Sequence, residues 1–118
     1  MQPILLVLED LKTLNIFCGF GSNMSISRSA IYIVGAKRTP FGAFGGKLKM
    51  LSATDLAVHS SIGAIAESKV NKDKIGECFV GNVIQSSLDA TYMSRHVALK
   101  SGLHVSTPAL SINRLCGR

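Results

Sequence analysis

Three short apolar runs, separated by two stretches that carry helix signals, constrain the fold of this 118-residue chain most strongly. The runs cover residues 30–36, 77–84 and 108–113, and turn-forming or polar residues bound them, as is typical of strands. The first run is continuous enough to predict a strand that is buried on both faces. The resulting β-α-β-α-β order predicts an α/β domain with a mainly parallel sheet.

The first helix should begin at Ser52. Residues 52–55 fit a capping box, in which the Ser52 hydroxyl accepts a backbone N–H and the Asp55 carboxylate reaches back to the start of the helix. Val58, Ile62 and Ile65 then recur at helical spacing. We therefore expect a helix that ends near residue 68 and covers the sheet with these three side chains.

A second helix is expected over residues 90–101. Asp89 stands where an N-cap residue would, and Lys100 and Gly102 provide a typical helix end. Met93 and Val97 share one face of this helix, which should pack against the same sheet.

The glycine-rich, basic stretch at residues 37–49 has the composition of a phosphate-binding loop. Gly42, Gly45 and Gly46 nevertheless match neither the P-loop spacing nor the dinucleotide-binding spacing. A closely packed loop that needs small residues is the favoured interpretation.

The composition describes a core-forming protein that carries excess positive charge. It is 47% hydrophobic, has 13 Lys and Arg against 7 Asp and Glu, and has no acidic residue between Asp10 and Asp55. An anionic partner, either a phosphorylated cofactor or an acidic surface, fits this charge. Nucleic acid is disfavoured because the basic residues are scattered and no aromatic residues interleave with them.

The cysteines and histidines argue against a disulfide framework and against a metal site. The three cysteines are odd in number and widely spaced, which fits a reducing compartment. We expect Cys78 to be a small core residue. The three histidines lack metal-ligand spacing and are expected on helix surfaces or in loops: His59, His96 and His104.

The first 27 residues are interpreted as a flexible extension. The apolar run at residues 4–8 is too short to span a bilayer and is followed by Glu9 and Asp10, so it predicts neither a signal peptide nor a membrane helix. Met24 is a natural alternative start. The serine-bearing, basic run after it weakly resembles a mitochondrial presequence.

Cys116 is the candidate nucleophile. It follows the third apolar run within residues 113–117, so a strand would deliver it onto a turn. If a helix followed, its dipole and free backbone N–H groups would favour the thiolate.

Four motifs resemble the thiolase family, in the family's order. They are residues 37–42 (KRTPFG), 81–85 (GNVIQ), 90–96 (ATYMSRH) and 113–117 (NRLCG). On these motifs, residues 28–118 resemble an incomplete thiolase amino-terminal domain, closest to the mitochondrial 3-ketoacyl-CoA thiolases. The resemblance implies a partial, layered α/β/α domain and less than a third of a full thiolase.

The resemblance also implies a reaction. Cys116 would attack the 3-keto carbonyl of a 3-ketoacyl-CoA, release acetyl-CoA and hold the shortened acyl group as a thioester until coenzyme A removes it. The backbone N–H of Cys116 would donate to the thioester oxygen in an oxyanion hole. Coenzyme A is then a substrate, and no permanently bound cofactor or metal is implied.

The helper residues of that reaction are expected to be missing. Thiolases supply activating histidines and a second cysteine from their carboxy-terminal half, and neither the histidines nor Cys18 and Cys78 match them. Arg118 stands where the family has small residues, and a terminal carboxylate near the sulfur would disfavour the thiolate. We therefore expect an inactive fragment of a mitochondrial β-oxidation acyltransferase.

Two alternatives stay open at this point. The chain could be a non-catalytic module that pairs with full-length thiolase subunits or with itself, since a partial sheet exposes strand edges. It could also be a small α/β domain of unrelated function, which is disfavoured because one sheet face would be poorly covered. A cytoplasmic location is the alternative to a mitochondrial one.

Overall fold

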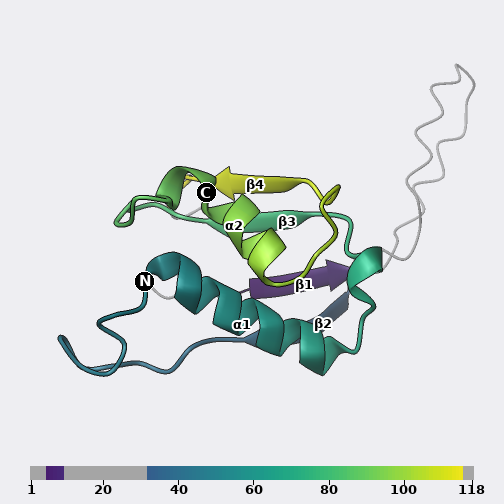
Figure 1. Ribbon diagram of the computed structural model, residues 1–118. Coiled ribbons are helices and arrows are strands. Elements are labelled where there is room, and N and C mark those ends of the chain that lie inside the picture. Colours follow the sequence, from purple (N-terminus) through teal and green to yellow (C-terminus); the bar gives the residue numbers. More distant parts are fainter. Residues whose placement is uncertain (1–4, 10–31, 116–118) are drawn as a thin grey trace, which may run out of the picture.

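The structure, a computed structural model, describes residues 5–9 and 32–115, with residues 5–9 described through their backbone. Within these ranges the chain has four strands, two α-helices and two short 3-10 helices (Figure 1). In chain order they are β1 (Leu5–Glu9), β2 (Tyr32–Lys37), α1 (Ala53–Ser68), η1 (Lys72–Lys74), β3 (Cys78–Gly81), η2 (Ala90–Tyr92), α2 (Met93–Lys100) and β4 (Ala109–Ile112). The predicted α/β class is confirmed.

The parallel part of the fold is the pair of strands β3 and β4. Cys78 lies opposite Ala109, and Gly81 lies opposite Ile112. The pairing is extended at one end by a hydrogen bond from Cys78 N to Pro108 O (3.0 Å) and at the other by one from Asn82 N to Ile112 O (3.0 Å). Helix α2 connects the two strands and packs on both, so this half is the predicted β-α-β unit.

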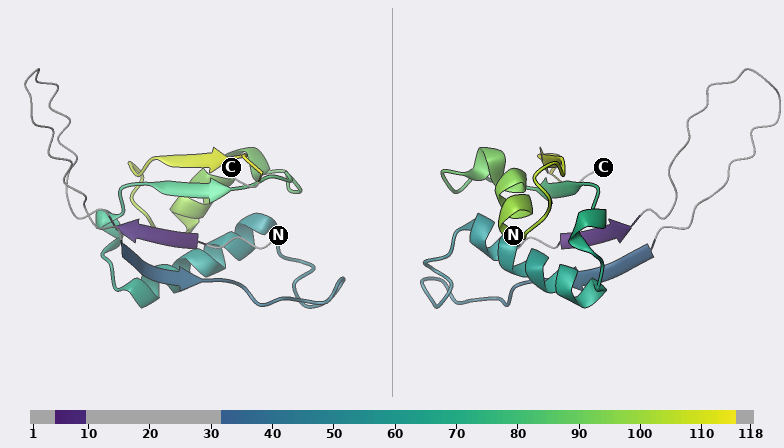
Figure 2. Two further views of the ribbon diagram at one scale, coloured as in Figure 1. Left: turned by 180° about the vertical axis from the view of Figure 1, so that it is seen from behind. Right: turned by 45° about the vertical axis from the view of Figure 1, so that its right-hand side comes forward.

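Strand β2 was predicted, but its partner β1 and the separate sheet that they form were not. Strand β1 runs antiparallel to β2, and these two form a sheet separate from that of β3 and β4. In every view β1 lies between β2 and β3 (Figures 1 and 2). The apolar run near the amino terminus, which we predicted to be part of a flexible extension, thus supplies a strand.

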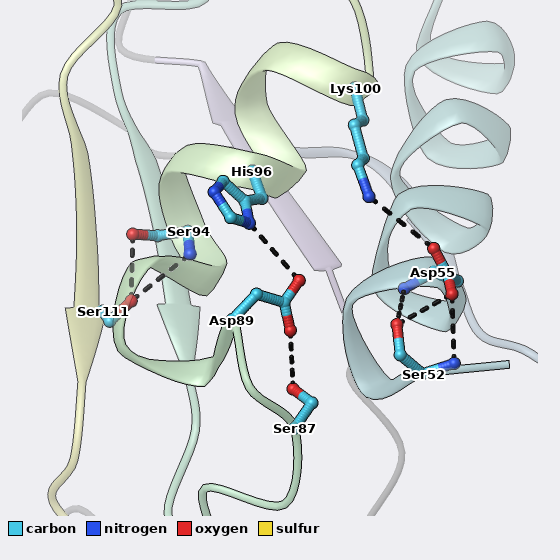
Figure 3. Close-up of polar contacts among 8 residues, drawn as sticks. All are labelled: Ser52, Asp55, Ser87, Asp89, Ser94, His96, Lys100 and Ser111. Carbon is cyan, nitrogen blue, oxygen red and sulfur yellow. Dashed lines mark hydrogen bonds and ion pairs between the residues drawn. The ribbon is translucent and has the colours of Figure 1, made fainter.

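Helix α1 begins at the predicted capping box. The Ser52 hydroxyl accepts from Asp55 N at 3.1 Å, while an Asp55 carboxylate oxygen accepts from Ser52 N at 3.1 Å (Figure 3). The helix ends at Lys69, whose φ of 57° places it in the left-handed region. Both predicted ends of this helix are confirmed.

The predicted packing face of α1 is confirmed in part. Ile65 is 6% exposed and Val58 packs against the core, but Ile62 is 45% exposed, while the small residues Ala57 and Ala64 are buried. The reason is close packing against β2, because a Cβ at Gly35 would lie 2.7 Å from Ala64 O. Only small residues fit at this helix–strand contact.

Strand β2 is also not buried on both faces, contrary to the prediction. Tyr32 and Ile33 are 60% and 63% exposed, while Gly35 is buried. Helix α1 packs against this strand, but Tyr32 and Ile33 are consecutive and point to opposite faces, so the start of the strand is exposed on both.

The core lies where α2 meets α1 and the β3–β4 pair. Met93 and Val97 are 2% and 1% exposed, which confirms the predicted face of the second helix. They pack with four further buried residues, which are Ala57, Cys78, Val80 and Ala98. An ion pair between Lys100 Nζ and Asp55 Oδ1 (3.8 Å) also joins the end of α2 to the start of α1.

Candidate active site

Cys116, the candidate nucleophile, lies outside the described residues. What the structure describes is the segment that leads to it, namely β4 and residues 113–115. The carboxyl ends of β3 and β4 lie side by side, because Gly81 pairs with Ile112. In open α/β sheets, ligands bind outside this end of the strands.

A pair of serines fixes β4 beneath α2. The Ser111 hydroxyl accepts from Ser94 N at 3.3 Å and donates to the Ser94 hydroxyl at 3.0 Å (Figure 3). Ser94 is 3% exposed, so these bonds join the first turn of the helix to the strand inside the domain. If β4 shifted, the buried polar groups of Ser94 would lose their hydrogen-bond partner, which costs free energy. These bonds therefore favour one position of the strand.

Arg95 fixes the loop that enters β4. Its guanidinium donates to Thr107 O at 3.0 Å and to Val105 O at 2.7 Å. Both acceptors are backbone carbonyls shortly before the strand begins. A planar, charged donor that contacts two carbonyls orients this backbone more firmly than a single bond would.

The chain changes direction directly before the candidate nucleophile. Leu115 has a φ of 44°, in the left-handed region that a branched residue rarely adopts and that costs of order 1–3 kcal/mol. Two residues earlier, Asn113 Nδ2 donates to Val83 O at 3.4 Å and ties the end of β4 to the segment after β3. The turn predicted at residues 116–117 lies outside the described residues.

Asp89 holds a polar cluster in the loop between β3 and α2. Its carboxylate accepts from the Ser87 hydroxyl at 2.7 Å and contacts His96 Nδ1 at 3.3 Å (Figure 3). The hydrogen bond from the Ser87 hydroxyl is the main cause that lowers the pKa of Asp89 to about 2. Asp89 precedes η2 but makes no capping bond with its side chain, so its predicted capping role is wrong.

Cys78 is a core residue, as predicted. It is 6% exposed, its thiol lies 3.7 Å from Ser94 O, and burial raises its pKa. A raised pKa keeps the sulfur protonated and a poor nucleophile.

The histidines lie apart from one another. His59 is exposed on α1, His96 contacts Asp89 from α2, and His104 Nδ1 lies 2.7 Å from the Ser106 hydroxyl in a loop. Over residues 5–9 and 32–115, no three His, Cys, Asp or Glu side chains gather where they could hold a metal ion. In the same ranges, no helix has the length and apolar character needed to cross a bilayer.

A shallow apolar depression of about 330 Å³ lies on the outer face of the β3–β4 pair. Glu77, Phe79, Pro108, Ala109 and Leu110 line it. Because Glu77 is the one ionisable residue in this lining, the depression lacks the convergent polar groups of a catalytic site. The depression could not be predicted from the sequence, since its two walls come from segments that are about thirty residues apart.

Comparisons with known proteins agree on one family. The family model described as "Thiolase, N-terminal domain" matches residues 31–118. The human mitochondrial 3-ketoacyl-CoA thiolase is 51% identical over 74% of this chain and 22% of its own length, and the mouse protein is 53% identical over the same shares. Human mitochondrial acetyl-CoA acetyltransferase is 38% identical over 73% of this chain and 20% of its own length.

Solved structures give the same result. A crystal structure of human mitochondrial 3-ketoacyl-CoA thiolase in complex with CoA aligns with a TM-score of 0.68 and 52% identity, over 71% of this chain and 21% of that one. Acetyl-CoA acetyltransferase from Syntrophomonas wolfei aligns with a TM-score of 0.59 and 29% identity, over 68% and 20%. The chain thus spans about a fifth of the length of these relatives.

Proposed function

Because this chain belongs to the thiolase family, with residues 31–118 matching its amino-terminal domain, we propose that it is the nucleophile-bearing part of a 3-ketoacyl-CoA thiolase. The reaction would be thiolytic cleavage of a 3-ketoacyl-CoA to acetyl-CoA and a shortened acyl-CoA. The observation that carries the proposal is the family match, which runs through residues 113–117 and so includes Cys116.

In this mechanism the Cys116 thiolate attacks the 3-keto carbonyl carbon, and the bond between C2 and C3 breaks. The leaving acetyl-CoA enolate takes a proton at C2 from a group that these 118 residues do not supply. The shortened acyl group stays on sulfur until the deprotonated thiol of a second coenzyme A attacks the thioester, which breaks the bond to Cys116 and releases its thiolate. The backbone N–H of Cys116 donates to the thioester oxygen, a contact often worth ~3 kcal/mol. Coenzyme A enters as a substrate.

The scaffold around β4 supports this role for Cys116. The Ser94–Ser111 bonds and the two Arg95 bonds fix the strand, and the left-handed turn at Leu115 directs the chain out of it. Positioning of this kind matters because small displacements of a nucleophile cost much of its rate.

We propose that these 118 residues alone have no turnover. The described histidines contact their own neighbourhood or solvent, and Cys78 is buried and protonated, so none is available as a base or as a second reactive thiol. In the relatives, the remaining four fifths of the length would supply such groups. The location we propose is the mitochondrion, in fatty-acid β-oxidation, as the names of the most similar relatives suggest.

The test is a thiolysis assay. The purified chain is incubated with a 3-ketoacyl-CoA and coenzyme A, and loss of substrate is compared with that given by human mitochondrial 3-ketoacyl-CoA thiolase. We expect no loss above the rate of a Cys116→Ala control. Turnover near that of the human enzyme would refute the proposed dependence on further residues.

A second candidate function is association with full-length thiolase subunits. It is favoured by the outer face of the β3–β4 pair, where Phe79, Leu110 and Ile112 are 52%, 55% and 40% exposed. Co-expression with the human mitochondrial enzyme followed by pull-down tests it, with Leu110→Glu as the matched variant. Absence of co-purification with the unaltered chain would rule this role out.

A further inference from the structure

Strand β1 lies outside the part of the chain that matches the thiolase family. The family match begins at residue 31, one residue before β2, whereas β1 is formed by Leu5–Glu9. The strand is therefore an addition to the family domain, and its position needs a separate explanation.

The addition pairs with the whole of β2. Leu5 lies opposite Lys37 and Glu9 lies opposite Tyr32, with an irregularity between Val7 and Leu8 that leaves Val34 as an extra residue on β2. An irregularity of this kind increases the local twist of a strand pair. The defined register at both ends distinguishes this pairing from loose contact of an apolar tail.

The added strand takes the edge of β2 that faces β3. It lies between these two strands in all views (Figures 1 and 2), and α1 packs against both β1 and β2. A strand, a crossover helix and a second strand normally join one parallel sheet. Here β2 and β3 belong to separate sheets.

Without β1, this edge of β2 would be unpaired, and an unpaired strand edge readily accepts another strand. Its backbone N–H and C=O groups are unsatisfied and can pair with another segment or another chain. Residues 5–9 (LLVLE) are apolar apart from Glu9 and contain neither proline nor glycine, so nothing in them opposes pairing with such an edge.

We propose that Leu5–Glu9 is an intramolecular strand that pairs with the β3-facing edge of β2. By pairing there, it keeps this edge of β2 from pairing with β3 or with a second chain. The β2 edge is thus a strand-binding surface, and its partner is the chain's own amino-terminal segment. The inference does not depend on thiolase chemistry, because it concerns the backbone pairing of β1 with β2 and involves no residue of the proposed reaction.

Disulfide trapping tests the proposed register with one set of four positions. In a chain with Cys18→Ser and Cys116→Ser, the in-register variants are Leu5→Cys with Lys37→Cys, and Glu9→Cys with Tyr32→Cys. The swapped variants pair Leu5→Cys with Tyr32→Cys, and Glu9→Cys with Lys37→Cys. Swapping separates partners by about four residues, or roughly 13 Å along the strand, which exceeds the reach of a disulfide.

We expect both in-register variants to form the intramolecular disulfide with a several-fold higher yield than both swapped variants, as measured by mass spectrometry under mild oxidation. Equal yields would overturn the proposal, and so would a higher yield in the swapped variants. Mass spectrometry identifies the disulfide-linked species directly. An unfolded chain has no strand register, so it would form the in-register and the swapped disulfides with equal yields.

A second pair of variants tests the backbone pairing. In the Leu5/Lys37 cysteine background, Leu6→Pro with Val7→Pro removes two successive amide donors, at least one of which would face β2. Leu6→Thr with Val7→Thr retains both donors and strand propensity. We expect the proline variant to lose the yield advantage and the threonine variant to keep it, and an unchanged yield in the proline variant would overturn the proposal.

Discussion

Gly35→Ala tests the close contact between β2 and α1. A Cβ at this position would lie 2.7 Å from Ala64 O and 3.3 Å from the Ser68 Cβ, whereas ordinary contact begins at 3.4 Å. The nearer atom is a backbone carbonyl inside α1, so relief requires the helix to move rather than a side chain to rotate. Overpacking of this kind costs about 1–3 kcal/mol.

The unfolded chain offsets part of that cost. Replacing glycine by alanine restricts the unfolded state and stabilises the fold by about 0.4–1 kcal/mol where the backbone allows it. The net prediction for Gly35→Ala is a loss of roughly 1–2 kcal/mol in the free energy of unfolding. Gly81→Ala is the matched control, because Gly81 also lies in a strand and a Cβ there meets no atom within 4 Å.

Thermal and urea unfolding, followed by circular dichroism, measure the difference. A change of 1 kcal/mol shifts the Tm of a domain of this size by about 4–8 °C. We expect Gly35→Ala to melt well below the unaltered chain, and Gly81→Ala to melt at the same temperature or slightly above. If Gly35→Ala were as stable as Gly81→Ala, the described packing of α1 on β2 would be wrong.

Three further predictions concern single side chains. Ser52→Ala should cost ~1 kcal/mol by removing the cap of α1, and an unchanged Tm would contradict the capping box. Asp89 has a folded-state pKa lowered to about 2, so the stability it contributes is present above about pH 4 and is lost as the pH falls toward 2. Asp89→Asn should flatten this part of the pH profile of the urea midpoint, and a profile identical to that of the unaltered chain would contradict the carboxylate network. Cys78 should react slowly with a thiol reagent in the folded chain and rapidly in urea, and equal rates would contradict its burial.

Local signals in the sequence predicted the helices well. The capping box of α1, Ser52 to Asp55, lies within four residues. The two residues that define the buried face of α2, Met93 and Val97, are one helical turn apart, so both features depend on residues close in the sequence. The packing face of α1 depends instead on Gly35, which lies about thirty residues from Ala64 in the sequence. No periodicity in α1 itself could indicate that Ala64 would meet β2 while Ile62 stays exposed.

The predictions that failed concerned which partners a residue or segment finds in the fold. Asp89 has the residue type and position of a helix cap, but its carboxylate contacts Ser87 and His96 instead. Residues 5–9 were predicted to be part of a flexible extension, because nothing in the sequence identified β2 as their partner. The candidate nucleophile was found from a short motif, and the residues that fix its strand, Ser94 and Arg95, became visible only in the structure.

The central claim is that Cys116 is the acyl acceptor of a thiolase, and a chimeric enzyme tests it most directly. Residues 31–117 of this chain replace the matching segment of human mitochondrial 3-ketoacyl-CoA thiolase, and thiolysis of a 3-ketoacyl-CoA is measured for the chimera and for its Cys116→Ala variant. Circular dichroism and gel filtration establish that both are folded. We predict turnover in the chimera and none in the variant, and a folded chimera whose activity survived Cys116→Ala, or that showed no activity at all, would contradict the claim.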